Sequence, residues 1–196
     1  MLTTTLYKGA GPGTHWHNTD PASCGGFKAP GGSLGANAAS HSTVVTHIAV
    51  RNSLGQWTLS AQSPLLSFSM SFAIAREYAL SGPGGLASKT QPGVVYEIDL
   101  SAVQGWTPSV VNPVAHLCSF NGTGAHAHQH DGCSTLIYQI AKGMSSYTAA
   151  PRSGGSSLAP IVSQDLIALV NAIRDAEVLI ADQVPAAAIV RRYMVW

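Results

Sequence analysis

The chain has 196 residues, of which 45% are hydrophobic and only 10% are charged, and its formal net charge at pH 7 is +1. This length is typical of one domain with a sizeable core, so we treat residues 1–196 as a single domain. The nearly neutral charge gives no electrostatic reason to expect a nucleic-acid backbone or a membrane surface as a partner. Because no apolar run approaches about 18 residues, no transmembrane helix is predicted.

The first third of the chain predicts strands around a long irregular segment. A strand is expected over residues 3–7, ended by Gly9. Residues 10–42 are dense in Gly, Pro, Ser and Asn, which is typical of a binding or covering loop. The β-branched residues 43–50 predict a second strand, and residues 56–61 are compatible with a third.

The middle of the chain predicts a strand, a helix and a further strand. Residues 65–68 predict a short buried strand that runs into a helix over about residues 70–80. The helix is expected to end at residues 81–85, a Gly- and Pro-rich terminator. Alternating apolar residues over 94–100 predict a half-exposed strand, and a loop that holds residues 116–133 follows.

The last part of the chain predicts a helix and two closing strands. Residues 135–141 favour a strand or a short helix, and residues 153–157 form a Gly/Ser linker within the domain. An apolar stripe at helical spacing predicts a helix over residues 160–173, and strands are expected over 177–180 and 188–195. Strands mixed with two or three helices, without regular alternation, indicate an α+β fold.

The sequence contains two groups of residues that could form a disulfide or bind a metal ion, and each group has more than one interpretation. Cys118 and Cys133 either close the loop between them as a disulfide or, with Cys24, remain free thiols. The alternating His126, His128 and His130, with Asp131 beside them, could converge on a zinc or copper ion. No second group of ligands stands at a metal-site spacing, so we expect no metal.

Three short segments carry the strongest functional signal. Ser67-Phe68-Ser69 ends a predicted strand at a helix N-terminus, where free backbone N–H groups can meet a ligand, although serine is also a preferred helix cap. Leu6-Tyr7-Lys8-Gly9 lies upstream, and Arg174-Asp175-Ala176-Glu177 lies near the C-terminus. In this order the segments resemble the ADP-ribosyltransferase superfamily, whose pattern is a basic residue before Gly, then Ser-Thr-Ser, then a glutamate that opens a late strand.

The resemblance implies a fold and a reaction. The fold would be two facing, mostly antiparallel sheets with flanking helices and a central cleft for NAD. The reaction would release nicotinamide from NAD and transfer ADP-ribose to a protein or nucleic-acid acceptor, or to water in an NAD glycohydrolase. Such small transferases are often toxins or effectors, so the resemblance implies a secreted or delivered monomer. Lys8 and Phe68 depart from the pattern, which leaves a catalytically silent binding module as a further alternative.

The resemblance assigns catalytic roles to Glu177, Asp175 and Ser67. Glu177 would hydrogen-bond the ribose beside nicotinamide and stabilise the oxocarbenium-like transition state. The alternative is a solvated glutamate at a strand start, and in either case we expect it to be partly exposed. Asp175 stands where family members carry Glu or Gln and would orient the acceptor, or it simply faces water. Ser67 would support Glu177 and the nicotinamide ribose.

The resemblance also assigns residues that hold NAD. Lys8 replaces the usual Arg and would meet the pyrophosphate as a point charge. The backbone of Gly9 would pair with the nicotinamide amide, and Ser69 matches the last Ser of the motif. Tyr78 would offer an aromatic face to nicotinamide, unless it belongs to the core, and Trp16 would stack on adenine or nicotinamide. Other catalytic templates are missing from the sequence: a nucleophile elbow, a P-loop, a Rossmann fingerprint or a Cys-x-x-Cys pair.

Overall fold

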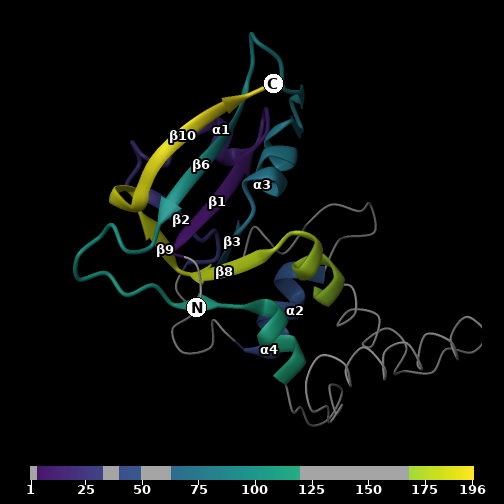
Figure 1. Ribbon diagram of the computed structural model, residues 1–196, viewed down its shortest axis with the longest axis vertical. Helices are drawn as coiled ribbons and strands as arrows, with labels where there is room; N and C mark the ends of the chain where they lie inside the picture. Colours follow the sequence, from purple (N-terminus) through teal and green to yellow (C-terminus); the bar gives the residue numbers. More distant parts are fainter. Residues whose placement is uncertain (1–3, 33–39, 50–62, 120–167) are drawn as a thin grey trace, which may run out of the picture.

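The computed structural model describes residues 4–32, 40–49, 63–119 and 168–196 (Figure 1). Within these residues the elements, in chain order, are β1 (Thr5–Ala10), α1 (His15–Asn18), β2 (Gly26–Lys28), α2 (His41–Ala49), β3 (Leu65–Ser69), α3 (Phe72–Ala79), β4 (Ser81–Gly82), β5 (Gly85–Leu86), β6 (Gly93–Asp99), β7 (Val110–Val111), α4 (Pro113–Ser119), β8 (Glu177–Ala181), β9 (Gln183–Pro185), a 3₁₀ turn (Ala186–Ala188) and β10 (Ile189–Val195). Residues 168–174 are helical as well. None of the described helices is long and apolar enough to cross a membrane.

One antiparallel sheet dominates the described part of the chain. Its six strands follow the order β10-β6-β1-β3-β8-β7, and each neighbouring pair is antiparallel. Two small antiparallel ribbons, β2-β9 and β4-β5, accompany it. The large antiparallel sheet with a few helices confirms the predicted α+β class.

The six-stranded sheet consists of two groups of three strands that meet at one residue pair. β1 and β6 pair continuously from Thr5↔Asp99 to Ala10↔Val94, and β3 pairs with β8 along its whole length. Between β1 and β3 the only pair is Tyr7↔Ser69. Figure 1 shows β1, β6 and β10 running steeply while β8 crosses beneath them. The strands therefore separate after Tyr7, where a continued register would have placed Gly9 opposite Ser67.

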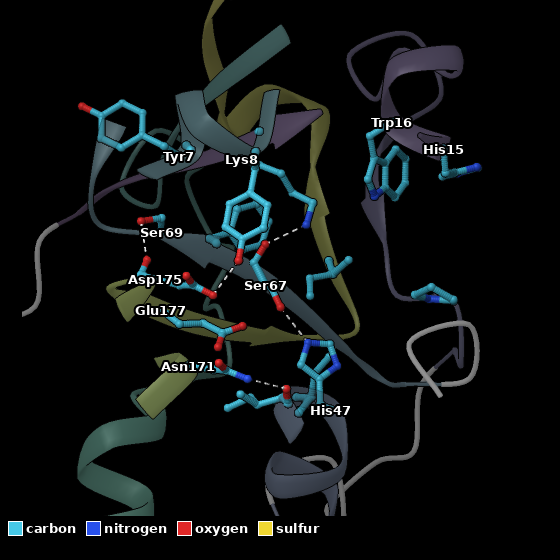
Figure 2. A pocket seen from close by; sticks show the side chains of 18 of the residues that line it. Tyr7, Lys8, His15, Trp16, His47, Ser67, Ser69, Asn171, Asp175 and Glu177 are labelled. Atoms are coloured by element: carbon cyan, nitrogen blue, oxygen red, sulfur yellow. Dashed lines mark hydrogen bonds between the residues drawn. The ribbon is translucent and has the colours of Figure 1, made fainter. Parts of the chain in front are cut away.

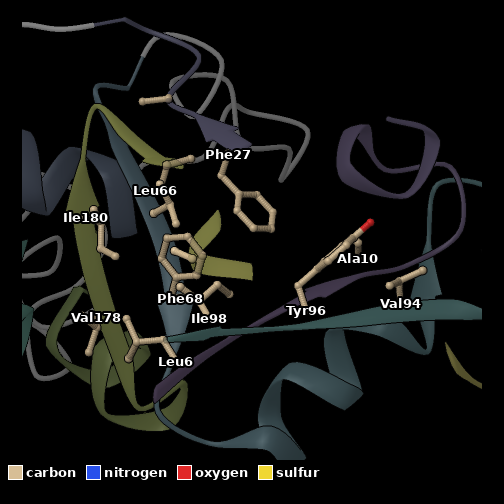
Figure 3. Close-up of a cluster of buried hydrophobic side chains, with 13 residues drawn as sticks. Leu6, Ala10, Phe27, Leu66, Phe68, Val94, Tyr96, Ile98, Val178 and Ile180 are labelled. Atoms are coloured by element: carbon tan, nitrogen blue, oxygen red, sulfur yellow. The ribbon is translucent and has the colours of Figure 1, made fainter. Parts of the chain in front are cut away.

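Aromatic side chains fill the core between the sheet and the β2-β9 ribbon (Figure 3). Phe27 from β2 is fully buried and makes edge-to-face contacts with Phe68, Tyr96 and Trp16, at centroid distances of 5.5, 5.4 and 5.0 Å. Contacts of this geometry add to the free energy that the rings gain by burial. Phe68, which departs from the family pattern, is thus a core residue.

The helices bury the remaining faces of the sheet. Ala75 and Ala79 of α3 pack on Val95 of β6, so this strand is covered on both faces and the predicted half-exposed strand is wrong in that respect. A third cluster gathers side chains of α2, α4 and the 168–174 helix around Leu179 of β8.

The strand predicted over residues 43–50 is also wrong, because His41–Ala49 form helix α2. Val44, Val45 and Ile48 are buried, and their spacing of three and four residues places them on one helical face. Burial of that face outweighs the β preference of the branched side chains.

Of the other predicted elements, some are confirmed by the structure and some are not. The strand at residues 65–68, the helix after it and the two closing strands are confirmed with small changes of boundary. The supposed loop over 10–42 contains α1 and β2, and α4 lies at the start of the supposed loop over 116–133. The expectations for residues 56–61, 135–141 and 153–157 lie outside the described residues, as do Cys133 and the histidines at 126, 128 and 130.

Gly9 is required by the packing of α3 on β1. A Cβ at Gly9 would lie 2.0 Å from the Ala75 carbonyl oxygen and 2.9 Å from Tyr78 Cβ. We expect Gly9→Ala to lower the free energy of unfolding by about 2–3 kcal/mol, because the helix must move away from the strand. Gly32→Ala is the control: its site is open but its φ is +65°, so only about 1 kcal/mol is expected. Equal losses in denaturant titrations would contradict this reading.

Candidate functional site

A cavity of about 690 Å³ opens where β1 and β3 separate (Figure 2). Its size falls in the range of about 300–1,000 Å³ that is usual for small-molecule sites. The walls come from β1, α1, β2, α2, β3, α3, the 168–174 helix and the start of β8. The lining residues with polar or aromatic side chains are Tyr7, Lys8, His15, Trp16, Lys28, His47, Ser67, Phe68, Ser69, Tyr78, Asn171, Arg174, Asp175 and Glu177.

The cavity brings together the three segments that carry the sequence signal. Lys8 Nζ donates a hydrogen bond of 2.8 Å to the Ser67 carbonyl oxygen, across the gap between β1 and β3. Glu177 lies opposite Ser69 in the β3-β8 register. The Lys8-Gly9 and Ser67-Phe68-Ser69 segments therefore line one cavity, as the resemblance implies by assigning both to the NAD site.

Glu177 is the first residue of β8, and only 8% of its surface is exposed, so the expectation of a partly exposed carboxylate is wrong. The pKa of Glu177 is raised to about 7, mainly by burial and to a smaller extent by the Asp175 charge. A hydrogen bond from Ser67 and the positive charges of Lys8 and Arg174 oppose this shift. Near pH 7 the carboxyl group is therefore poised between its two protonation states.

A hydrogen-bonded chain leads to Glu177 through His47, which the sequence did not single out. Ser63 Oγ lies 2.6 Å from His47 Nδ1, and His47 Nε2 lies 2.7 Å from Ser67 Oγ. A Ser67 hydroxyl that donates to the Glu177 carboxylate, the contact that lowers the pKa of Glu177, leaves the Ser67 oxygen to accept from His47 Nε2–H and Nδ1 to accept from the Ser63 hydroxyl. The Leu65 N–H completes the chain by donating to Ser63 Oγ.

His47 is neutral in this arrangement. Burial, aided by the charge of Lys8, lowers the pKa of the imidazole to about 4. A neutral imidazole has one donor and one acceptor nitrogen, which matches its place between the Ser63 and Ser67 hydroxyls. His47 was missed because residues 43–50 were expected to form a strand. The signal that finds it is the helical spacing of Val44 and Ile48, which sets His47 beside the buried face.

Lys8 forms part of the wall behind the carboxylate. Desolvation lowers the pKa of the Lys8 ammonium to about 8, and the Glu177 charge counteracts this shift. Its Nζ stands 5.5 Å from the centroid of the Phe68 ring. One N–H is used by the Ser67 carbonyl, so two donors remain for an anionic ligand.

Asp175 is engaged by its neighbours. Its carboxylate accepts hydrogen bonds from Arg174 Nε at 2.6 Å, from Arg174 Nη2 at 2.7 Å and from the Tyr78 hydroxyl at 2.7 Å. The expectation of an acid that faces water is wrong, since only 17% of the Asp175 side chain is exposed.

Tyr78 lines the cavity and is 50% exposed, so it is no core residue. Burial of its hydroxyl, and then the hydrogen bond to Asp175, raise the pKa of Tyr78 to about 12. The hydroxyl therefore stays protonated and keeps donating to Asp175.

Ser69 holds the turn before β8 in place. Its hydroxyl donates to the Asp175 carbonyl oxygen at 2.6 Å and accepts from the Ser71 N–H at 3.0 Å. The Met70 N–H donates to the carbonyl of Ala176, whose φ of 46° makes the turn sharp. The donor that the resemblance reserved for NAD is thus used within the protein.

The remaining expected residues lie around the same cavity. Trp16 lines the cavity and packs edge-to-face on Phe27 and His15. Gly9 also lines it, but its missing side chain faces α3. Asn171 was not expected; it lines the cavity and its Nδ2 donates to the Ile48 carbonyl at 3.4 Å.

In the part of the chain that the structure describes, no group of three or more His, Cys, Asp or Glu residues could hold a metal ion. Comparisons of the chain with protein-family models, with curated proteins and with solved structures found no match. The case for a function therefore depends on the geometry of this cavity and on the order of the three segments.

The buried carboxylate makes a prediction about stability. Because the folded pKa of Glu177 is raised to about 7, its charge destabilises the fold fully above that pH and not at all below about pH 4. We expect Glu177→Gln to increase the free energy of unfolding by about 3 kcal/mol at pH 8 and to have little effect at pH 4.

Denaturant titrations at the two pH values measure this difference. Glu77→Gln removes the same charge from an exposed position on α3, where 70% of the side chain is accessible, and should change little at either pH. A gain for Glu177→Gln that is equal at pH 4 and pH 8 would contradict the assigned pKa.

Proposed function

We propose that this protein is a mono-ADP-ribosyltransferase that cleaves the nicotinamide–ribose bond of NAD. The observation that carries the proposal is the buried Glu177 carboxyl group at the end of the Ser63–His47–Ser67 chain, in a cavity that also holds Lys8. The two groups of three strands that separate around this cavity would correspond to the two facing sheets of the family fold.

The mechanism follows from the charge of Glu177. As the glycosidic bond breaks, both of its electrons go to the pyridinium nitrogen, which leaves as neutral nicotinamide, and positive charge develops on the ribose. The Glu177 carboxylate would accept a hydrogen bond from the ribose 2′-hydroxyl and face this charge. The chain through His47 and Ser67 fixes the carboxylate before the substrate arrives, so little reorganisation is needed in the transition state.

The other lining residues would hold the rest of NAD. The two free donors of Lys8 suit a phosphate oxygen, and the Tyr78 ring offers an apolar face for nicotinamide. Trp16 stands on the α1 wall, where an adenine ring could stack. The proposed context is a secreted or delivered toxin or effector that acts as a monomer on a macromolecular acceptor.

A second candidate is an NAD glycohydrolase, in which water takes the ADP-ribose. The observation that favours it is the full engagement of Asp175, which leaves that carboxylate without a free oxygen to orient an acceptor. Release of nicotinamide is common to both candidates, whereas a silent binding module would release none.

Replacement of Glu177 tests the catalytic assignment. Glu177→Gln keeps the shape of the side chain but removes the charge, so nicotinamide release should slow about a hundredfold to a thousandfold, equivalent to roughly 3–4 kcal/mol. The release is measured by chromatography with NAD as substrate, and circular dichroism verifies folding. The exposed Glu77→Gln serves as the matched control. A folded Glu177→Gln protein with the wild-type rate would refute the assignment.

The pH dependence tests the pairing of Glu177 with Lys8. Activity requires Glu177 ionised and Lys8 protonated, so kcat/KM should rise through about pH 7 and fall above about pH 8. Asp175 and Arg174 also face Glu177 but form an ion pair, and His47 titrates only near pH 4.

The Lys8→Arg variant tests whether deprotonation of Lys8 causes the fall of kcat/KM at alkaline pH. Because a guanidinium does not titrate in this range, the variant should keep its activity up to at least pH 9. An alkaline fall that persists unchanged in Lys8→Arg would show that another group causes it.

A further inference from the structure

The rim of the cavity beside Glu177 carries a cluster of three polar side chains, which we call the rim cluster: Arg174, Asp175 and Tyr78. Arg174 approaches Asp175 side-on, with Nε 2.6 Å from Oδ1 and Nη2 2.7 Å from Oδ2. The Tyr78 hydroxyl donates to the same Oδ2 at 2.7 Å and accepts from Arg174 Nη2 at 3.1 Å. Figure 2 shows Asp175 directly above Glu177.

The rim cluster presents a cation to the solvent. The Asp175 side chain is 17% exposed, whereas that of Arg174 is 51% exposed. Since both oxygens of Asp175 are occupied, the outer N–H groups of Arg174 are what an approaching molecule meets. The position two residues before Glu177 therefore holds a carboxylate whose charge is cancelled from within the protein.

The position of the rim cluster is fixed by the backbone. The Asp175 carbonyl accepts from Ser69 Oγ at 2.6 Å, and the Ala176 carbonyl accepts from the Met70 N–H at 2.9 Å. These bonds tie the turn to the end of β3, so Asp175 cannot leave Arg174 by a shift of the turn alone.

This arrangement disfavours cationic acceptors. A guanidinium is recognised by a carboxylate with two open oxygens, through a pair of parallel charge-assisted hydrogen bonds. Here Arg174 already occupies those oxygens, and a second guanidinium would meet a charge of its own sign. An uncharged nucleophile meets neither obstacle.

We propose that the ADP-ribose acceptor is an uncharged nucleophile, and that the Arg174–Asp175 pair excludes guanidinium and ammonium groups from the reacting carbon. The inference rests on the proposed function and names the class of its second substrate. Arg174 acts here as a specificity-determining residue, because it occupies the Asp175 oxygens that would otherwise bind a cationic acceptor.

The transfer step balances with the residues present. A hydroxyl oxygen of the acceptor forms a bond to the ribose C1′ as the bond from C1′ to nicotinamide breaks, and nicotinamide leaves with the bonding electrons. The hydroxyl proton passes to the Glu177 carboxylate and then to solvent. A carboxyl group with a pKa of about 7 is well matched to accept and release that proton near neutral pH.

The test compares two small acceptors in reactions with NAD: agmatine, which carries a guanidinium, and methanol, which is uncharged. Mass spectrometry measures ADP-ribosyl-agmatine and methyl-ADP-ribose, and nicotinamide release without an added acceptor measures the proposed function separately. For the wild-type protein we expect methyl-ADP-ribose and no detectable agmatine adduct.

Arg174→Gln should raise the ratio of agmatine adduct to methyl-ADP-ribose at least tenfold, because it frees Asp175. The double variant Arg174→Gln/Asp175→Asn should lose this gain. Arg76→Gln, an equal loss of charge at a 43% exposed position on α3, should leave the ratio unchanged. Calorimetric titration of the proteins with agmatine alone should detect binding to Arg174→Gln and none to the wild-type protein.

The outcomes separate the two proposals. An agmatine adduct formed by the wild-type protein at a rate near that of methanolysis would overturn the inference and leave the transferase in place. An unchanged product ratio in Arg174→Gln would also overturn it. Absence of nicotinamide release from a folded wild-type protein would refute the proposed function and, with it, the inference that rests on it.

Discussion

The whole site depends on the separation of β1 from β3 after a single residue pair. Tyr7↔Ser69 joins the two groups of strands, and beyond it the backbones of Gly9 and Ser67 no longer pair. Lys8 bridges the opening by donating to the Ser67 carbonyl, which satisfies one polar group that the separated strands leave without a strand partner. A continuous ladder would have closed the space that the cavity now occupies.

Burial disfavours the charged forms of the titratable groups in this opening. Desolvation raises the pKa of Glu177 and lowers those of Lys8 and His47, so the ionised forms of Glu177 and Lys8 cost free energy in the fold, whereas His47 stays neutral. The Phe27 cluster on one side and α3 on the other supply apolar burial that offsets this cost. A cluster of groups with shifted pKa values in one cavity is typical of binding and catalytic sites.

The sequence predicted the class of fold and the meeting of the three segments, but it did not predict the environment of each side chain. The alternation in β6 identified a strand, yet nothing in it showed that α3 covers Val95. The branched residues of α2 favoured a strand by local preference, and only their tertiary burial selects the helix that presents His47. Side-chain partners over long separations, such as His47 with Ser67 or Tyr78 with Asp175, follow from packing that no local pattern encodes.

Asp175 and Glu177 show how the fold gives different roles to acidic side chains that lie close together in the sequence. Asp175 lies at the rim, where a guanidinium and a hydroxyl satisfy both of its oxygens. Glu177 lies at the buried start of β8, where Ser67 is its hydrogen-bond partner and burial raises its pKa. The different surroundings of the two acids separate a structural charge at Asp175 from a reactive carboxyl group at Glu177. The turn pinned by Ser69 creates the difference, because it sets the two side chains at different depths in the same cavity.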